Sequence, residues 1–126
     1  MPKQVPDVPS GTTPLGPYST VTEAAGLVFI SGQIAIDPAT DKPIEGDVGE
    51  QTVRVMKNLG AILGDLGLGY GDIVKTTIFL ADMADFPAVN AVYGGYFTDA
   101  PPARSTVEVG ALPGGFQVEI EAIATR

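Results

Sequence analysis

The chain has 126 residues, of which 44% are hydrophobic and 17% are charged, with seven Lys and Arg residues against fifteen Asp and Glu residues. It has no cysteine and no histidine, which excludes disulfides, the usual zinc sites, iron–sulfur clusters, cysteine nucleophiles and any imidazole base. The net charge of −8 argues against nucleic acid as a partner, because phosphate binding requires basic patches.

The N-terminal third is expected to contain an arm, a hairpin and a loop. Residues 1–16 include four prolines and should be irregular. Residues 18–23 and 26–31 are predicted to be short strands joined at Ala24–Ala25. Residues 33–46 contain two prolines, each in a turn-forming pair, and are predicted to form a loop.

A long amphipathic helix is predicted to follow. Asp47 and Glu50 have the spacing of a capping box, in which each side chain bonds to the backbone N–H of the other residue. The glycine-rich stretch at residues 67–71 should end the helix. Side chains at helical spacing should form its buried face: Val48, Thr52, Val55, Leu59, Ile62 and Leu66.

The remaining elements are a strand, a helix and two further strands. Residues 72–80 are rich in β-branched side chains and predict a strand. Asp82 is expected to cap the second helix, with Pro87 tolerated near its start. Residues 104–109 and 116–124 are predicted to be the last two strands. One face of the second helix should carry Phe86, Val89, Tyr93 and Phe97.

The predicted order is β-β-α-β-α-β-β, and strand–helix–strand units with right-handed crossovers place both helices on the same face of the sheet. We expect one domain spanning residues 1–126. No apolar run is long enough to cross a membrane and no signal peptide is apparent, so we expect a cytoplasmic protein.

The strand at residues 72–80 is apolar on both sides, which is typical of strands buried on both faces. We expect one face to carry Val74, Thr76, Ile78 and Leu80, and the other to carry Ile73, Thr77 and Phe79. The two helices cover only one face. We therefore predict that another copy of the chain covers the second face, in a closed homo-oligomer.

Arg104 begins an apolar strand in a chain that has few cations. If the valines of the last two strands face the helices, alternation places Arg104, Thr106, Glu119 and Glu121 together on the second face. Arg104 could then pair with a glutamate as an interface salt bridge. Alternatively, it binds a ligand carboxylate while a nearby glutamate, with its pKa raised by desolvation, acts on a water molecule.

Other candidate residues have ordinary structural explanations as well as functional ones. The GLGYGD segment is predicted to be a helix stop, since a phosphate-binding loop needs the order strand, glycines, helix. Asp37 and Asp41 are expected to be turn residues. Tyr18 suits hairpin packing as well as a ligand site, and Gly32 suits a turn as well as a backbone contact. Asn90 could equally be a solvated amide on the second helix.

Several segments together resemble the Rid/YjgF family, the reactive intermediate deaminases, over nearly the whole chain. The resemblance implies a chorismate-mutase-like α+β fold with the last strand antiparallel inside the sheet. It also implies a homotrimer with three clefts between subunits. The motifs that carry it are GPYS (16–19), FISGQI (29–34), FPAVNAVYGGYF (86–97), PPARSTVEV (101–109) and VEIEAIA (118–124).

The resemblance implies a hydrolase that uses neither metal nor cofactor. Its substrates would be reactive 2-enamine and 2-imino acids such as 2-aminoacrylate, and its products 2-keto acids and ammonia. This is the activity of a 2-iminobutanoate/2-iminopropanoate deaminase. The alternative is a non-catalytic trimer that binds or senses small carboxylates. An RNA-cleaving role, proposed for parts of the family, is disfavoured by the acidic charge.

Matched by position, the resemblance makes Arg104 the carboxylate-binding residue and Glu119 the acid that positions the attacking water. Thr106 stands where many members have cysteine, and the expected contact there is the backbone N–H, which threonine keeps. The other substrate-binding residues that the resemblance implies are Tyr18, Ser31, Gly32 and Asn90.

Overall fold

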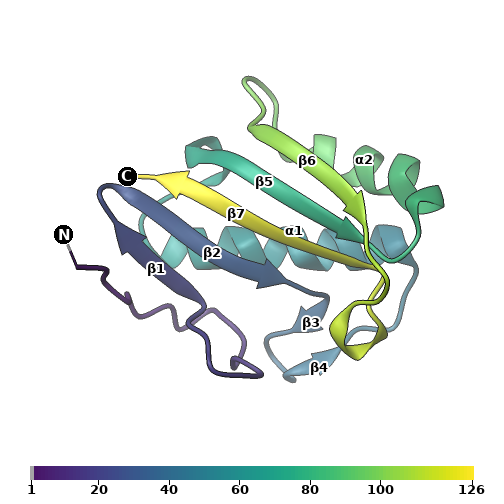
Figure 1. Ribbon diagram of the computed structural model, residues 1–126, viewed down its shortest axis with the longest axis horizontal. Helices are drawn as coiled ribbons and strands as arrows, with labels where there is room; N and C mark the ends of the chain where they lie inside the picture. The colour runs from purple at the N-terminus through teal and green to yellow at the C-terminus, as the bar shows by residue number, and fades with distance from the viewer. Residues whose placement is uncertain (1) are drawn as a thin grey trace.

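The computed structural model describes residues 2–126, and a five-stranded mixed sheet with two helices on one face makes up most of it (Figure 1). The predicted α+β class and element order are confirmed. The main elements are β1 (Val21–Ala24), β2 (Leu27–Gln33), α1 (Val48–Asp65), β5 (Ile73–Leu80), α2 (Phe86–Gly94), β6 (Ala103–Glu108) and β7 (Val118–Thr125).

The strand order is β1-β2-β7-β5-β6, so the last strand lies in the middle of the sheet. β7 runs antiparallel to both of its neighbours, β2 and β5, while β5 and β6 are parallel and are joined through α2. β2 and β5 consequently run in the same direction, with β7 between them. This arrangement confirms the inserted antiparallel strand that the family resemblance implies.

Helix α1 forms as its capping residues and apolar spacing dictate. The Glu50 backbone N–H donates to the Asp47 carboxylate at 2.9 Å, and the Asp47 N–H donates to the Glu50 carboxylate at 3.3 Å. The helix stops before Gly67, whose φ of 74° favours glycine, so the helix-stop prediction is confirmed. The side chains of α1 that pack between helix and sheet include Val55, Met56, Leu59, Ile62 and Leu63.

Besides shifts of one or two residues at strand ends, the structure differs from the predicted elements in three places. The first strand begins at Val21 rather than at residue 18. The predicted loop at 33–46 holds a small hairpin of β3 (Ile36–Asp37) and β4 (Lys42–Pro43), with Ile36 buried. Asp82 caps a short 3-10 turn, η2 (Met83–Asp85), by accepting from the Ala84 N–H at 2.9 Å. It therefore does not cap α2.

β5 contains an irregularity that alternation cannot predict. Its register with β7 shifts between Ile73 and Lys75. As a result Ile73 is buried, whereas Val74 is 44% exposed and does not share the core face with Thr76, Ile78 and Leu80. The predicted face assignment is wrong at these two positions, because one extra residue in a bulge reverses the direction of the side chains beside it.

The face assignment of β6 also needs correction. Arg104 lies opposite Thr76, and Thr106 lies opposite Ile78, both of which point into the core beneath the helices. Val107 lies opposite Phe79 on the other face and is 41% exposed. Arg104 and Thr106 therefore face the helix side, and only Glu119 and Glu121 lie on the open side. The assumption that valines face the helices fails for β6, because it is the edge strand and α2 packs against its polar side.

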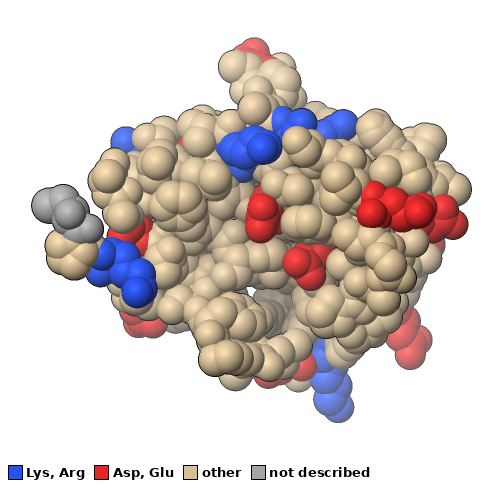
Figure 2. Space-filling view, in the orientation of Figure 1, with Lys and Arg blue, Asp and Glu red and all other residues tan. Residues whose placement is uncertain are grey.

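The face of the sheet that the helices leave open has carboxylates toward its middle and Lys or Arg atoms above them, with mostly uncharged surface around both (Figure 2). Its exposed apolar side chains include Leu27, Phe29 and Val107. Between residues 2 and 126 the structure has no helix that combines the length and apolarity needed to span a bilayer.

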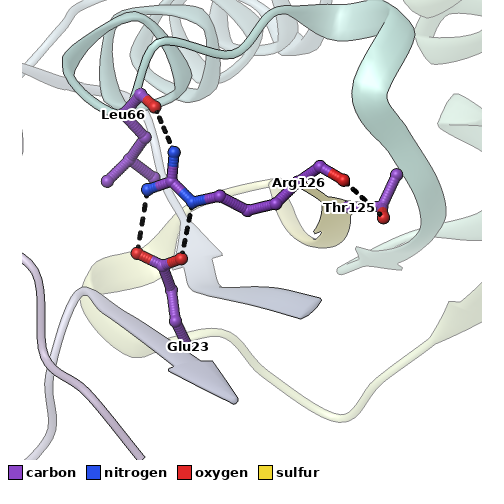
Figure 3. Close-up of polar contacts among 4 residues, drawn as sticks. All are labelled: Glu23, Leu66, Thr125 and Arg126. Carbon is purple, nitrogen blue, oxygen red and sulfur yellow. Dashed lines mark hydrogen bonds and ion pairs between the residues drawn. The ribbon is translucent and has the colours of Figure 1, made fainter. Parts of the chain in front are cut away.

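Arg126 ties three elements together at one end of the sheet (Figure 3). Its Nε and Nη2 donate to the Glu23 carboxylate at 2.7 and 3.0 Å, and its Nη1 donates to the Leu66 carbonyl at 2.7 Å. The residue after β7 thus connects β1 with the C-terminal end of α1.

Candidate functional site

A cavity of about 470 Å³ lies on the open side of the sheet, between the N-terminal arm, β2 and β7. Figure 2 shows this face hollowed beside the arm. Four of the residues predicted for the site line it together: Tyr18, Ser31, Gly32 and Glu119. Glu121, two residues further along β7, lines it as well.

The Glu119 carboxylate lies directly against Gly32. β2 bulges at this point, since its pairing with β7 shifts register between Ile30 and Gln33. A methyl group on residue 32 would overlap the Glu119 carboxylate. The glycine is therefore required for close approach of a side chain, a role distinct from the turn or backbone contact considered from the sequence.

Burial raises the pKa of Glu119 above its usual value, and the nearby negative charge of Glu121 raises it further. Glu119 is half-buried, while Glu121 is exposed. No Lys or Arg is among the described residues that line the cavity. The cavity thus offers a carboxylate that is easier to protonate than usual, in an acidic setting.

Ser31 and Tyr18 both form hydrogen bonds to the chain that precedes β1. The Ser31 hydroxyl donates to the Ser19 carbonyl at 2.6 Å, and its backbone N–H donates to the Thr20 carbonyl at 2.9 Å. The Tyr18 side chain is half exposed, and its hydroxyl accepts from the Leu15 N–H at 3.2 Å. Ser31 therefore fastens the segment between the arm and β1 to the cavity wall, and Tyr18 forms part of the rim.

Arg104 and Asn90 form a second group, on the helix side of the sheet. The Arg104 Nη1 donates to Asn90 Oδ1 at 2.8 Å, and the guanidinium carbon lies 5.5 Å from the Phe86 ring centre and 5.1 Å from that of Tyr93. Within residues 2–126, Arg104 forms no salt bridge. The ion pair with a glutamate that the sequence left open is absent from this part of the chain.

Thr106 adds a backbone donor to the same edge. Its hydroxyl is buried and has no hydrogen-bond partner within the described chain. The Val109 N–H donates to the Leu80 carbonyl on β5. Since backbone groups alternate in direction along a strand, the Thr106 N–H points away from β5, to the free edge of the sheet.

The predicted residues thus form two groups on opposite sides of one sheet. Alternation of side chains correctly grouped Glu119 with Glu121, but it could not reveal that Phe86 and Tyr93 contact Arg104. The signal was present in the helix, because residues 86, 90 and 93 recur at helical spacing and share a face. The arm residues Thr12 and Thr13, which line the cavity, carried no such signal. Within residues 2–126, no group of three acidic side chains could hold a metal ion.

The sequence profile of the family described as Endoribonuclease L-PSP matches residues 10–126. The protein DfrA of Myxococcus xanthus is 54% identical over 112 residues, which cover 87% of this chain and 86% of that one. A mouse protein named 2-iminobutanoate/2-iminopropanoate deaminase is 45% identical over 112 residues, covering 89% and 83%. The crystal structure of YyfA from Yersinia pestis, of the conserved Rid family, superposes with a TM-score of 0.94 at 43% identity, covering 99% and 100%.

Proposed function

The chain belongs to the Endoribonuclease L-PSP family, which is the Rid/YjgF family that its motifs resemble, and on this premise we propose that it hydrolyses 2-enamine and 2-imino acids. The substrates are compounds such as 2-aminoacrylate and its imine, 2-iminopropanoate. The products are the corresponding 2-keto acid and ammonia. The name of the mouse relative supports this class of reaction.

The observation that carries the proposal is the Glu119 carboxylate, held against Gly32 in the cavity with its pKa raised. Water adds to C2 of the protonated imine while Glu119 takes a proton from the water. Glu119 then returns that proton to nitrogen, and the C–N bond breaks as the hydroxyl oxygen forms the C=O bond. The hydroxyl proton passes through Glu119 to the released ammonia, which leaves as ammonium. The imine carbon is already electrophilic, so the site chiefly needs to hold the water and orient the substrate.

The substrate carboxylate needs a cation, and Arg104 is suited to that task because it is not paired with an acid within the described chain. Charge-assisted hydrogen bonds of this kind contribute roughly 1.5–3 kcal/mol each. Asn90 contacts Arg104 from helix α2, and the Thr106 N–H lies on the same strand as Arg104. In this proposal, both groups complete the binding site for the substrate carboxylate. Tyr18, Ser31 and Gly32 belong with Glu119.

Arg104 and Glu119 lie on opposite sides of the sheet of one chain, so the proposed site joins two copies. The cavity lies toward the β1–β2 side of the sheet, and Arg104 lies on the opposite edge strand, β6. A head-to-tail contact would bring the β6 edge of one copy to the cavity of the next, and such contacts form a ring when the rotation closes. We propose a homotrimer, with the exposed apolar side chains of the open face buried between copies.

The test supplies the substrate from a pyridoxal-phosphate-dependent dehydratase that releases 2-aminoacrylate, and follows formation of the keto acid with and without this protein. We expect acceleration by the wild type, with loss of at least about 100-fold in kcat/KM for Arg104→Ala and for Glu119→Gln. The exposed Glu45 provides the control, because Glu45→Gln should keep wild-type activity.

A folded wild type that gives no acceleration over buffer would rule out the deaminase proposal. Binding of 2-keto acids without turnover would then favour the alternative, a non-catalytic carboxylate-binding trimer. Full activity in Arg104→Ala would reject the site assignment while leaving the reaction intact.

A further inference from the structure

The guanidinium of Arg104 lies over two aromatic rings of α2. Phe86, Asn90 and Tyr93 occupy one face of the helix, and all three contact Arg104. A cation held within about 6 Å of an aromatic ring centre is attracted by the electrons of the ring face. α2 therefore supplies both rings and the one hydrogen-bond acceptor that fix the side chain.

A hydrogen bond to strand β5 holds the Tyr93 ring in position. Its hydroxyl shares a hydrogen bond of 2.7 Å with the hydroxyl of Thr76, which is fully buried on β5. Thr76 is the direct neighbour of Arg104 in the parallel pair of β5 and β6. The same strand register thus sets the positions of the cation and of the ring beneath it.

Only one of the guanidinium N–H groups is used within residues 2–126, the one on Nη1 that donates to Asn90. The Nε and Nη2 donors have no partner in this part of the chain. These two groups form one edge of the planar guanidinium, and their spacing matches the two oxygens of a carboxylate.

We propose that Phe86 and Tyr93 are positioning residues for ligand binding, because their rings orient the Arg104 guanidinium so that its Nε–Nη2 edge receives one carboxylate. The inference rests on the proposed function for the identity of the ligand, a small 2-imino or 2-keto acid. Neither ring needs to touch the reacting carbon. Loss of a ring should therefore weaken binding and leave the chemical step at Glu119 unchanged.

The test measures binding of 2-oxobutanoate, a stable keto acid, by titration calorimetry. Phe86→Leu keeps most of the apolar volume and removes the ring, and we expect its Kd to rise roughly three- to tenfold. Phe86→Tyr keeps a ring face and should restore binding to within about twofold of wild type. In the imine assay, Phe86→Leu should raise KM by a similar factor with kcat nearly unchanged.

Phe97→Leu is the matched control. Phe97 packs on Tyr93 at 4.8 Å between ring centres but does not contact Arg104. The Phe97→Leu variant should bind 2-oxobutanoate as the wild type does.

Tyr93 is buried and its truncation risks misfolding, so Tyr93→Phe is used instead. This variant keeps the ring and removes only its hydrogen bond to Thr76, so its Kd should rise less than that of Phe86→Leu.

The inference is overturned if Phe86→Leu binds with wild-type affinity, if Phe97→Leu weakens binding as much, or if the wild type does not bind 2-oxobutanoate. A loss in Tyr93→Phe larger than that in Phe86→Leu would show that the hydroxyl, and not the ring faces, determines the affinity, and would overturn the inference. Binding that depends on Arg104 and Phe86 in a protein that shows no turnover would support this inference and refute the proposed function.

Discussion

Gly32 and Glu119 show how a single residue position determines the candidate site. The backbone of Gly32 does not lie in the left-handed region, so its role is to leave space for the Glu119 carboxylate. The sequence suggested both residues through a family motif. It did not show that they touch, because the contact depends on the bulge in β2 and on the pairing of β2 with β7.

Gly32→Ala should therefore reduce activity far more than stability. The added methyl group should displace the Glu119 carboxylate from its position. We expect kcat/KM to fall by about 10-fold or more, because moving a catalytic group by about 1 Å can lower the rate by that much. The measurement pairs imine hydrolysis with thermal unfolding. Gly64→Ala is the matched control, because a methyl group there meets no atom within 4 Å and should leave activity unchanged. Wild-type activity in Gly32→Ala would contradict this role.

The pair of carboxylates in the cavity makes a directional prediction about pH. The negative charge of Glu121 helps to raise the pKa of Glu119. Glu121→Gln removes that charge, so the pKa of Glu119 should fall and the acid limb of the kcat/KM profile should move to lower pH. An acid limb that stays in place, or moves to higher pH, would show that Glu121 does not act on Glu119.

The raised pKa of Glu119 in the wild type also makes folding stability depend on pH. A carboxyl group whose folded pKa is raised binds more protons in the folded than in the unfolded state between the two pKa values. The contribution of Glu119 to stability is therefore full below its unfolded pKa and is lost as pH rises through its folded pKa. Glu119→Gln should remove this decline, which can be checked by urea unfolding across that pH range.

At the scale of secondary-structure elements, helices were predicted more reliably than strand faces. The capping residues and apolar spacing of α1 act locally, so the sequence contains them in full. The faces of β5 and β6 depend on a bulge at Val74 and on which side of an edge strand a helix covers. Both are decided by distant parts of the chain.

Arg126 joins three elements, and its removal should lower thermal stability modestly. Arg126→Ala loses the paired contact with Glu23 and the bond to the Leu66 carbonyl. The effect should shrink in high salt, because the pair lies at the surface, with 43% of the Arg126 side chain exposed. Lys57→Ala, at an exposed cation on α1, is the control and should unfold as the wild type does.

The stability that the Arg126–Glu23 pair contributes should depend on pH. Arg126 holds the pKa of Glu23 below its usual value, chiefly through the hydrogen bond. The stability that the pair supplies is therefore present above the unfolded pKa of a glutamate and is lost as pH falls through the lowered folded value. The thermal midpoints of wild type and Arg126→Ala should converge in acid. A difference that grows in acid would contradict this assignment.

At the scale of the whole molecule, the open sheet face should be an interface between copies. Phe29 is 41% exposed on this face and packs outside the core, so Phe29→Glu should leave the fold intact while opposing association. Light scattering should give about three times the 13.0 kDa of one chain for the wild type, and a smaller mass for the variant. Met83→Glu, on the η2 turn, is the control. A monomeric wild type would reject the trimer and with it the shared site.

By itself, the sequence determined the α+β class, the order of elements, the course of α1 and the residue types available for chemistry. Capping, helical periodicity and composition are local properties, so they can be recognised in the sequence without knowledge of the fold. Only the tertiary structure decided that Glu119 lies against Gly32 on one side of the sheet, and that Arg104 lies over Phe86 and Tyr93 on the other. The reason is strand register, because a shift of one residue turns every following side chain to the opposite face.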